Sequence, residues 1–424
     1  MLSADMNRNY VASKRIRETP IWWVLFDFAN SILLTTGGIY FLKLYLQKPD
    51  TSQIVFNYSL SVSAAIGVVT CIYLARRINS ANNLFGFVTA SSIGVVTSAA
   101  IIVSFFASGN AILELYGTLI AFCLLTIFYQ VSIILHNVLL VKSLNSSRYS
   151  ENSGYSTAAN WTGSLVAVLL SMLVLSGHVP LIQNSLIGVV LFAIIAASPL
   201  LFYSIYKMNS IGQLALKDGV LTTPDSDFTS VQKTPAHFIF FLVAYLLFMD
   251  SAISIQNNLT VSLSQLYGLG DNQIGAYFLS ILLGAVAGAL LAGFNKLVIT
   301  KPYLYYLPIL IFALASILVG IGKNSSFLYL SCAMAGLAVG AFETASRASL
   351  AALLPDSSVG LGMSLFAAVQ RLSNLVGPAI WATTLLAFGG GVVATQAAFM
   401  ALAAITLLSI PIFIISELHR QKTT

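Results

Sequence analysis

DFANSI, over Asp27–Ile32, recurs as DSAISI over Asp250–Ile255, and both copies lie inside long apolar stretches. The shared pattern D-x-A-x-S-I, with one copy in each half of the chain, indicates a duplicated membrane protein. A carboxylate in the hydrocarbon of a bilayer costs on the order of 3 kcal/mol on insertion scales, so it usually faces a cavity or a partner. Asp27 and Asp250 are therefore the first candidate functional residues.

The composition also indicates a membrane protein. Of the 424 residues, 58% are hydrophobic and 8% are charged, whereas an ordinary soluble domain carries about 25% charged residues. A soluble fold cannot hide that much apolar surface. Cys71, Cys123 and Cys332 lie in apolar runs without C-x-x-C spacing, which predicts neither a disulfide framework nor a zinc site. The first twenty residues are polar and basic, so we expect no cleaved signal peptide.

Apolar runs of about 20 residues predict twelve transmembrane helices in an all-α fold. The expected spans are 21–46, 54–75, 84–107, 113–141, 154–176, 184–206, 237–258, 272–295, 302–321, 326–354, 360–387 and 392–416. They form one six-helix bundle over 21–206 and a second over 237–416. The stretch 207–236 is rich in Gly, Pro, Ser and Asp, a composition typical of a flexible linker.

The basic residues predict the orientation of the chain, because cytoplasmic loops carry an excess of Lys and Arg. Those that fall on one side are Arg8, Lys14, Arg15, Arg17, Arg76, Arg77, Lys142, Arg148, Lys207, Lys217, Lys233, Lys296, Lys301, Arg420 and Lys422. Only Lys48 and Lys323 clearly lie opposite. We therefore expect the segments 1–20 and 417–424 and the linker to be cytoplasmic. Topology accounts for the net charge of +6, and no basic face interleaved with aromatics indicates a nucleic-acid partner.

Each copy of the repeated pattern lies within a polar stripe on its helix. In the first helix, Asp27, Ser31 and Thr35 recur at a spacing of four, and Asn30 widens the stripe. In the seventh helix the stripe is formed by Asp250, Ser254 and either Asn257 or Asn258, of which we select Asn257. Two stripes at matching places predict a shared wet cavity. The alternative is that each Asp is structural, hydrogen-bonded to neighbouring helices for packing specificity.

Other charged residues within the expected helices are candidates for a conformational switch. Glu343 and Arg347 are four residues apart in the tenth helix, the spacing at which opposite charges pair. The pair is either a static bridge or a switch that breaks and reforms. His136 in the fourth helix is either a proton relay or a packing residue. Arg371 in the eleventh helix either partners an acid or an anionic substrate, or extends to an interface.

Enzyme chemistry has no support in the sequence. No Ser nucleophile with a paired His base, no Walker-type phosphate loop and no H-E-x-x-H metal motif occurs. We therefore predict a protein that is not an enzyme, without a cofactor or a catalytic metal, and without an ATP-driven mechanism.

Five helices carry strings that together resemble a known family. They are FDFANSI from Phe26, SGYSTAANWTGSL from Ser153, FLVAYLLFMDSAISI from Phe241, and SRASLAALLPDSSVGLGMSLFAAVQRLSNLVGPAI from Ser346. These strings resemble the unknown-major-facilitator family, whose members typically read Y-D-W-A-N-S, S-x-x-G-x-A-x-G-Y-x-G, Y-D-G and S-R-S-L-x-A-x-L-I-P followed by G-P. The resemblance implies two six-helix bundles around a central cavity with alternating access, and kinship with fungal vacuolar exporters of amino acids.

The match to this family is incomplete. Asp27, Asn30, Ser31, Asp250, Ser346 and Arg347 fall on the family pattern, whereas Glu343 stands where the family more often has Gln. The segment LARR, over Leu74–Arg77, lacks the Asp that the family places in a cytoplasmic gate, and GFNK, over Gly293–Lys296, lacks its acid as well. Charge-paired gating by these two loops is therefore in question.

These observations predict a multi-pass protein, of the plasma membrane and able to act as a monomer, that moves a small polar solute. In transporters built from repeats the substrate site lies near the bilayer midplane between the halves, where we expect Asp27 and Asp250. One Asp, with Asp27 favoured for its neighbour Asn30, is expected to carry a proton and the other to bind the amino group of an amino acid or short peptide. The alternative is a transport-inactive scaffold or sensor that kept the fold.

Overall fold

The computed structural model describes residues 21–37, 53–77, 81–110, 112–143, 149–175, 186–217, 236–294, 305–322, 325–353 and 359–421. Over these residues the chain is helical and contains no strand. The first helix covers Ile21–Gly37. The others are α2 (Gln53–Arg77), α3 (Ala81–Ala107), the π-helical turn η1 (Leu113–Gly117) leading into α4 (Thr118–Ser143), α5 (Tyr149–Leu175), α6 (Leu186–Lys217), α7 (Ala236–Tyr267), α8 (Asp271–Phe294), α10 (Tyr306–Ile321), α11 (Ser325–Leu353), α12 (Val359–Ala387) and α13 (Gly391–Gln421).

Each of the twelve predicted spans overlaps one of these helices, although residues 38–46 of the first span lie outside the described residues. Several helices are longer than predicted. α6 continues to Lys217, into the stretch assigned to the linker, and α7 continues to Tyr267 rather than ending at 258. α13 reaches Gln421, beyond the predicted end at 416. An apolar window marks only the part of a helix that matches hydrocarbon, so polar turns that extend past it are missed. Residues 218–235 of the expected linker lie outside the described residues.

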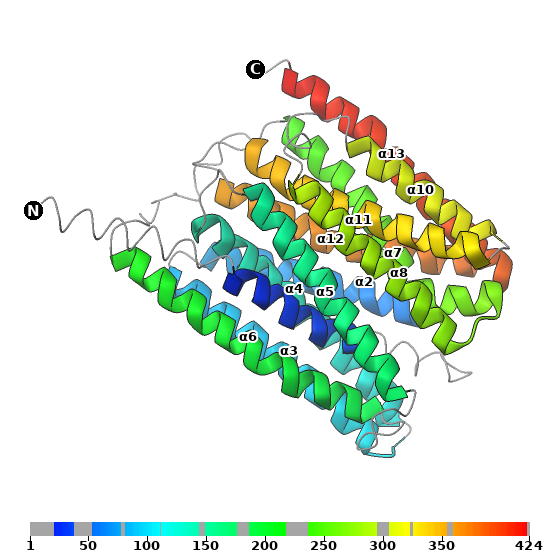
Figure 1. The fold of residues 1–424 in the computed structure, drawn as a ribbon, viewed down its shortest axis with the longest axis horizontal. Helices are drawn as coiled ribbons and strands as arrows, with labels where there is room; N and C mark the ends of the chain where they lie inside the picture. The colour runs from blue at the N-terminus through cyan, green and yellow to red at the C-terminus, as the bar shows by residue number, and fades with distance from the viewer. Residues whose placement is uncertain are drawn as a thin grey trace, which may run out of the picture.

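Figure 1 shows the helices of the two halves side by side. α3 and α6 lie along one outer edge and pack against each other, while α10 and α13 pack together along the opposite edge. The remaining helices fill the space between these pairs. We call the end where the first helix begins and α13 ends the proximal end, and the opposite end the distal end.

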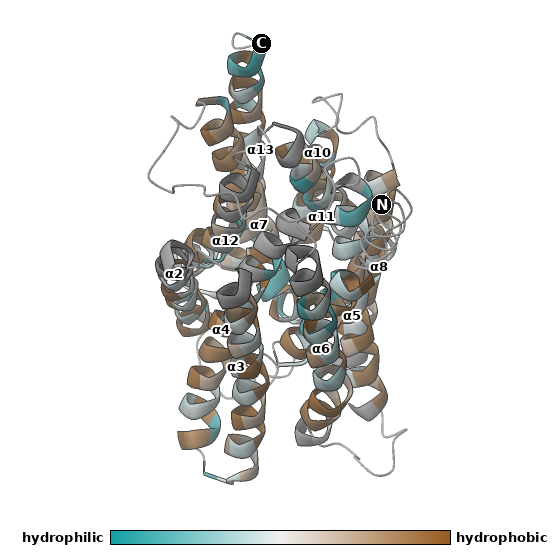
Figure 2. Ribbon diagram, turned by 90° about the vertical axis from the view of Figure 1, so that its left-hand side faces the viewer, coloured by the Kyte–Doolittle hydropathy of each residue, from teal (hydrophilic) through white to brown (hydrophobic). Residues whose placement is uncertain are grey.

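The surface of the helices suits a bilayer. Among the described residues, eight helices are long and apolar enough to cross a membrane, and the first helix, α2 and α10 contribute shorter apolar segments. Large apolar side chains stay exposed on them, including Val69, Ile195, Leu291 and Val393. Hydrophobic colouring follows most helices along their length in Figure 2. Because lipid is as apolar as these side chains, their exposure carries no penalty in a membrane.

The two halves repeat one packing contact, as a duplication predicts. In the first half α5 approaches the first helix at Gly163, where an added Cβ would lie 2.3 Å from the Phe28 carbonyl oxygen. In the second half α12 approaches α7 at Gly377, where an added Cβ would lie 2.4 Å from the Asp250 carbonyl oxygen. Each D-x-A-x-S-I segment is thus held against a glycine of the fifth helix of its own half.

Candidate functional site

Side chains from two neighbouring helices hold the carboxylate of Asp27, a residue that is 3% exposed. The Ser156 hydroxyl of α5 donates a hydrogen bond to Oδ2. Nδ1 of His136, on α4, lies 3.5 Å from Oδ1, within ion-pair distance when the imidazole is protonated. The His136 ring is stacked between Trp23 and Phe26, with ring centroids 3.8 and 4.3 Å away. The aromatic rings therefore fix the imidazole beside the carboxylate.

The rest of the first polar stripe has structural partners. Asn30 is fully buried, and its Nδ2 donates to Ser132 Oγ of α4 at 3.0 Å. The Ser31 hydroxyl donates to the carbonyl oxygen of Asp27 at 2.7 Å, so it is used within its own helix. Thr35 reaches Ser164 Oγ of α5 at 2.8 Å. The stripe thus faces α4 and α5, and Asn30 Oδ1 has no partner among the described residues.

The predicted pairing of Glu343 and Arg347 on α11 is confirmed. Nη2 of Arg347 donates to Oε1 of Glu343 at 2.9 Å, and both side chains are buried. Nε2 of Gln370, on α12, donates to the same Oε1 at 2.8 Å. Two donors therefore compensate the Glu343 charge, as a buried ion requires.

The Asp27 and His136 pair interacts electrostatically with Arg347 across the boundary between the halves. Arg347 interacts electrostatically with Asp27 and Tyr129 of the first half as well as with Glu343 and Tyr245 of the second. On α5, one turn from the serine that binds Asp27, the Ser153 hydroxyl donates to the Thr344 carbonyl oxygen of α11 at 3.4 Å. We call Asp27, His136, Glu343 and Arg347 together the central charge cluster.

The central charge cluster lies in the proximal half of the bundles. Asp27, His136 and Arg347 each stand roughly two turns from the proximal end of their helices. The sequence placed the candidate acids near the middle of the bilayer. That depth stays a prediction, because a position along a helix does not locate the boundaries of the membrane.

Asp250 has partners of a different kind. It is 1% exposed, and Oδ1 accepts a hydrogen bond from the backbone N–H of Gly377 on α12 at 2.5 Å. Pro378 follows directly and has no N–H of its own. Ser254 also faces this point, because a Cβ on Gly377 would lie 2.0 Å from its Oγ. Asp250 therefore links α7 to α12 within the second half. This agrees with the alternative that the acid is structural and hydrogen-bonded to a neighbouring helix.

The expected meeting of the two Asp side chains is replaced by separate environments. Asp27 is bound by α4 and α5 of the first half, whereas Asp250 is bound by α12 of the second. Asp250 Oδ2 and Ser254 Oγ have no hydrogen-bond partner among the described residues. The printed partners of the two carboxylates thus lie in different halves, and Asp27 interacts electrostatically with Arg347 of the second half.

The polar stripe of α7 ends at Asn258 rather than at the predicted Asn257. Asn258 is fully buried, and its Nδ2 donates to the Ser254 carbonyl oxygen at 2.9 Å. It also exchanges hydrogen bonds with Asn57 of α2, at 2.8 and 2.9 Å. Asn257 is only partly buried. A spacing of four from Ser254 would have selected Asn258.

Some predicted site residues cannot be placed. The backbone of Arg371 belongs to α12, but its side chain lies outside the part of the chain that the structure describes. The side chains of Leu74–Arg77 also lie outside the described part of the chain. Asn295 and Lys296 of the second altered loop lie outside it altogether. Gln370, Trp23 and Phe26 contact the charged residues but were not predicted as site residues. Nothing in their spacing distinguishes them from ordinary packing residues.

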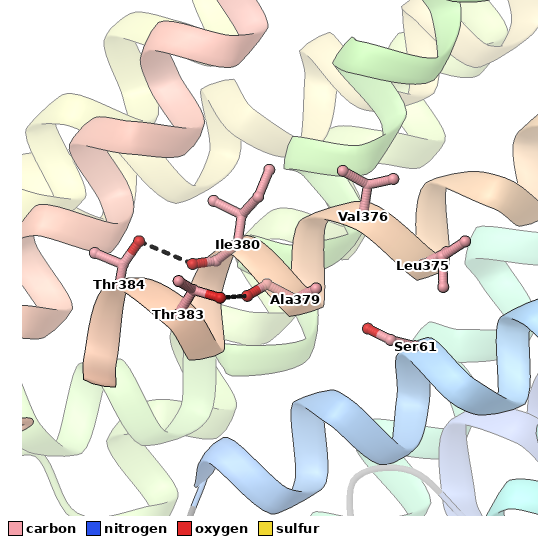
Figure 3. Close-up of a pocket in the computed structure, with 7 residues that line it drawn as sticks. All are labelled: Ser61, Leu375, Val376, Ala379, Ile380, Thr383 and Thr384. Carbon is pink, nitrogen blue, oxygen red and sulfur yellow. Dashed lines mark hydrogen bonds between the residues drawn. The ribbon is translucent and has the colours of Figure 1, made fainter. Parts of the chain in front are cut away.

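A cleft of about 430 Å³ lies between α2 and α12, on the seam between the halves. It is lined by Ser61 of α2 and by Leu375, Val376, Ala379, Ile380, Thr383 and Thr384 of α12, as Figure 3 shows. Its hydroxyl groups are bonded to carbonyl oxygens of their own helices. The cleft therefore offers an apolar wall. Across the described residues, no group of three His, Cys, Asp or Glu side chains could hold a metal.

Comparison with solved structures identifies the architecture. The human organic anion transporter MFSD10 (TETRAN) matches with a TM-score of 0.64 at 14% identity, over 94% of this chain and 99% of that chain. The proton:xylose symporter XylE, of the major facilitator superfamily, matches with a TM-score of 0.68 at 12% identity, over 94% of both chains. The chain has the major-facilitator fold. A bacterial homologue of the iron transporter ferroportin also matches, with a TM-score of 0.64 at 13% identity, over 93% of this chain and 99% of that chain.

The major-facilitator fold confirms the predicted all-α class of two six-helix bundles. No protein-family profile matches the sequence, and the search of curated proteins gives no match. The resemblance to the unknown-major-facilitator family therefore stays a prediction, while the superfamily architecture is a finding. The three neighbours differ widely in what they are described as carrying, so the fold does not specify a substrate.

Proposed function

We propose that the protein is a secondary active transporter that moves a small polar solute, an amino acid or a short peptide, by alternating access with proton coupling. The observation that carries the proposal is the central charge cluster. It joins buried, opposite charges from both halves at the boundary where transporters built from repeats bind substrate. We further propose a plasma-membrane location with both termini cytoplasmic, and activity as a monomer.

Asp27 and His136 form the proton site in this proposal. Imidazole and carboxylate groups in contact can share or exchange a proton, and a buried acid within a membrane is by default a functional residue. Protonation of Asp27 removes the negative charge that Arg347 meets across the boundary. The attraction between the halves then weakens, since charges interact strongly at low dielectric. Proton binding is thereby linked to separation of the two bundles.

Glu343 and Arg347 form the substrate site in this proposal. A free amino acid carries an ammonium and a carboxylate group, and the pair presents one charge complementary to each. Arginine binds carboxylates through parallel hydrogen bonds, and Arg347 Nε has no hydrogen-bond partner among the described residues. The carboxylate of a bound amino acid would pair with Arg347 and its ammonium group with Glu343, in place of the ion pair between the two side chains. The family resemblance to exporters of amino acids supports the same class of substrate.

A transport-inactive scaffold or sensor is the second candidate function. It is favoured by the two loops, LARR and GFNK, that lack the acids expected in a cytoplasmic gate. Such a protein would keep the fold and lose transport. The buried central charge cluster argues against this candidate, because four charged or titratable groups have little reason to persist in an idle cavity.

Reconstitution in liposomes separates these candidates. Purified protein is incorporated into vesicles, and uptake of a panel of labelled amino acids and dipeptides is measured with and without an imposed pH gradient. The proposal predicts uptake of at least one solute that rises when the gradient is imposed. The same uptake with and without the pH gradient would contradict proton coupling. No uptake of any solute would favour the scaffold.

A further inference from the structure

The two halves are joined at the distal end by a pair of amide side chains. Asn57 of α2 donates from Nδ2 to Oδ1 of Asn258 on α7 at 2.8 Å, and Asn258 returns a hydrogen bond to Asn57 Oδ1 at 2.9 Å. Both side chains are fully buried. This reciprocal pair lies roughly one turn from the distal start of α2, away from the central charge cluster at the proximal end.

Hydrogen bonds within each helix orient the amide pair. Asn258 Nδ2 also donates to the Ser254 carbonyl oxygen at 2.9 Å, and the Ser262 hydroxyl donates to the Asn258 carbonyl oxygen at 2.7 Å. On α2, Ser61 Oγ donates to the carbonyl oxygen of Asn57 at 3.1 Å. A buried amide left without its partner costs about 1 to 3 kcal/mol. The pair therefore favours contact between the halves at this end.

The seam beside the amide pair contains an apolar cleft. The cleft between α2 and α12 begins at Ser61, one turn from Asn57 (Figure 3). Tyr58 adds a hydroxyl contact of 3.3 Å to Thr383 on the same seam. Polar bonds beside an apolar cleft can break without disrupting interlocked side chains. By contrast, α8 and α11 within the second half are in backbone contact at glycines and must move together.

We propose that Asn57 and Asn258 form a distal latch that holds the bundles together at that end and that breaks when the cavity opens there. The latch rests on the proposed alternating access. It explains why a polar amide pair is buried at a place where apolar side chains could hold the helices together without the cost of burying polar groups. It also places the amide pair at the distal end, opposite the central charge cluster at the proximal end.

Thiol labelling tests the latch without any substrate. Val261, buried about one turn beyond Asn258 and packed in a cluster with Phe56 and Leu60 of the first half, is replaced by Cys in a background where the native cysteines are Ser or Ala. The labelling rate with a membrane-impermeant maleimide is then measured in vesicles. The latch predicts that Asn57→Val and Asn258→Ala each raise this rate several-fold. The double variant should resemble either single variant, because one shared interaction is lost.

Thr395→Val provides the matched control. It removes a distal hydrogen bond of 2.9 Å to Gln265 that lies within the second half, so the labelling rate should not change. Asn57→Ser is a milder second variant if Asn57→Val does not give monodisperse protein. An unchanged rate in folded variants at position 57 would overturn the latch. A raised rate in a protein that transports nothing would keep the latch and reject the proposed transport.

Discussion

At the residue scale, the two copies of one pattern have diverged in role. Asp27 contacts a titratable imidazole and meets the charge of Arg347 from the other half. Asp250 instead caps a backbone N–H beside a proline. The sequence shows two equivalent acids because it records the pattern and not the partners, which lie more than a hundred residues away along the chain. The electrostatic interaction with Arg347 of the other bundle is what distinguishes Asp27 from Asp250.

Replacement of Asp250 tests its structural role. Asp250→Asn keeps an oxygen that can accept from the Gly377 N–H, whereas Asp250→Leu leaves that buried donor unsatisfied, at a cost of about 1 to 3 kcal/mol. We expect thermal unfolding of the purified protein in detergent to show a clear loss of stability for Leu and little change for Asn. Equal destabilisation by both variants would show that the charge, and not the hydrogen bond, matters.

The Glu343 and Arg347 pair gives a second prediction, testable by a double-mutant cycle. Removing one partner leaves an uncompensated buried charge, so Arg347→Met should lower the free energy of unfolding by about 3 to 5 kcal/mol. Removing both, in Glu343→Gln with Arg347→Met, should cost much less. Denaturant unfolding of the three variants measures the coupling. Additive losses would mean that the two side chains act independently.

At the element scale, hydrophobic patterning predicts where helices lie but not how closely they pack. The apolar runs indicate where the twelve helices lie. The G-x-x-x-G spacing of Gly336 and Gly340 on α11 permits close approach of a neighbouring helix. A Cβ on either glycine would lie 1.9 Å from a carbonyl oxygen of α8, that of Ile281 or Ala285. The sequence did not reveal that α8 also contributes two glycines, Gly284 and Gly288, to this contact. Cβ atoms added to them would lie 2.3 and 2.1 Å from carbonyl oxygens of α11.

A pair of glycine substitutions tests this packing. Gly340→Ala forces α8 and α11 apart, and overpacking of this kind costs about 1 to 3 kcal/mol or more. Gly86→Ala on α3 is the matched control, because an added Cβ there meets nothing within 4 Å. We expect the melting temperature in detergent to fall for Gly340→Ala and to stay the same or rise for Gly86→Ala. A similar shift for both would contradict backbone contact between these helices.

At the scale of the whole molecule, the duplication, the two bundles and the membrane class follow from composition and repeats. The placement of the central charge cluster does not, because it depends on which helix faces meet when the bundles assemble. His136 shows the limit clearly. Its sequence context is an ordinary apolar helix, yet folding places it against Asp27 and between two aromatic rings. These contacts lie within the first half, and the electrostatic interaction of Asp27 with Arg347 of the second half completes the central charge cluster.

The most direct test of this account measures gradient-driven uptake in liposomes for Asp27→Asn beside Glu151→Gln. Glu151 is an exposed acid at the start of α5, so its replacement removes a charge of the same sign outside the central charge cluster. We predict that Asp27→Asn inserts and folds but loses the response of uptake to the pH gradient, while Glu151→Gln responds as the unmodified protein does. A full response in Asp27→Asn would contradict the claim that this carboxylate couples protons to transport.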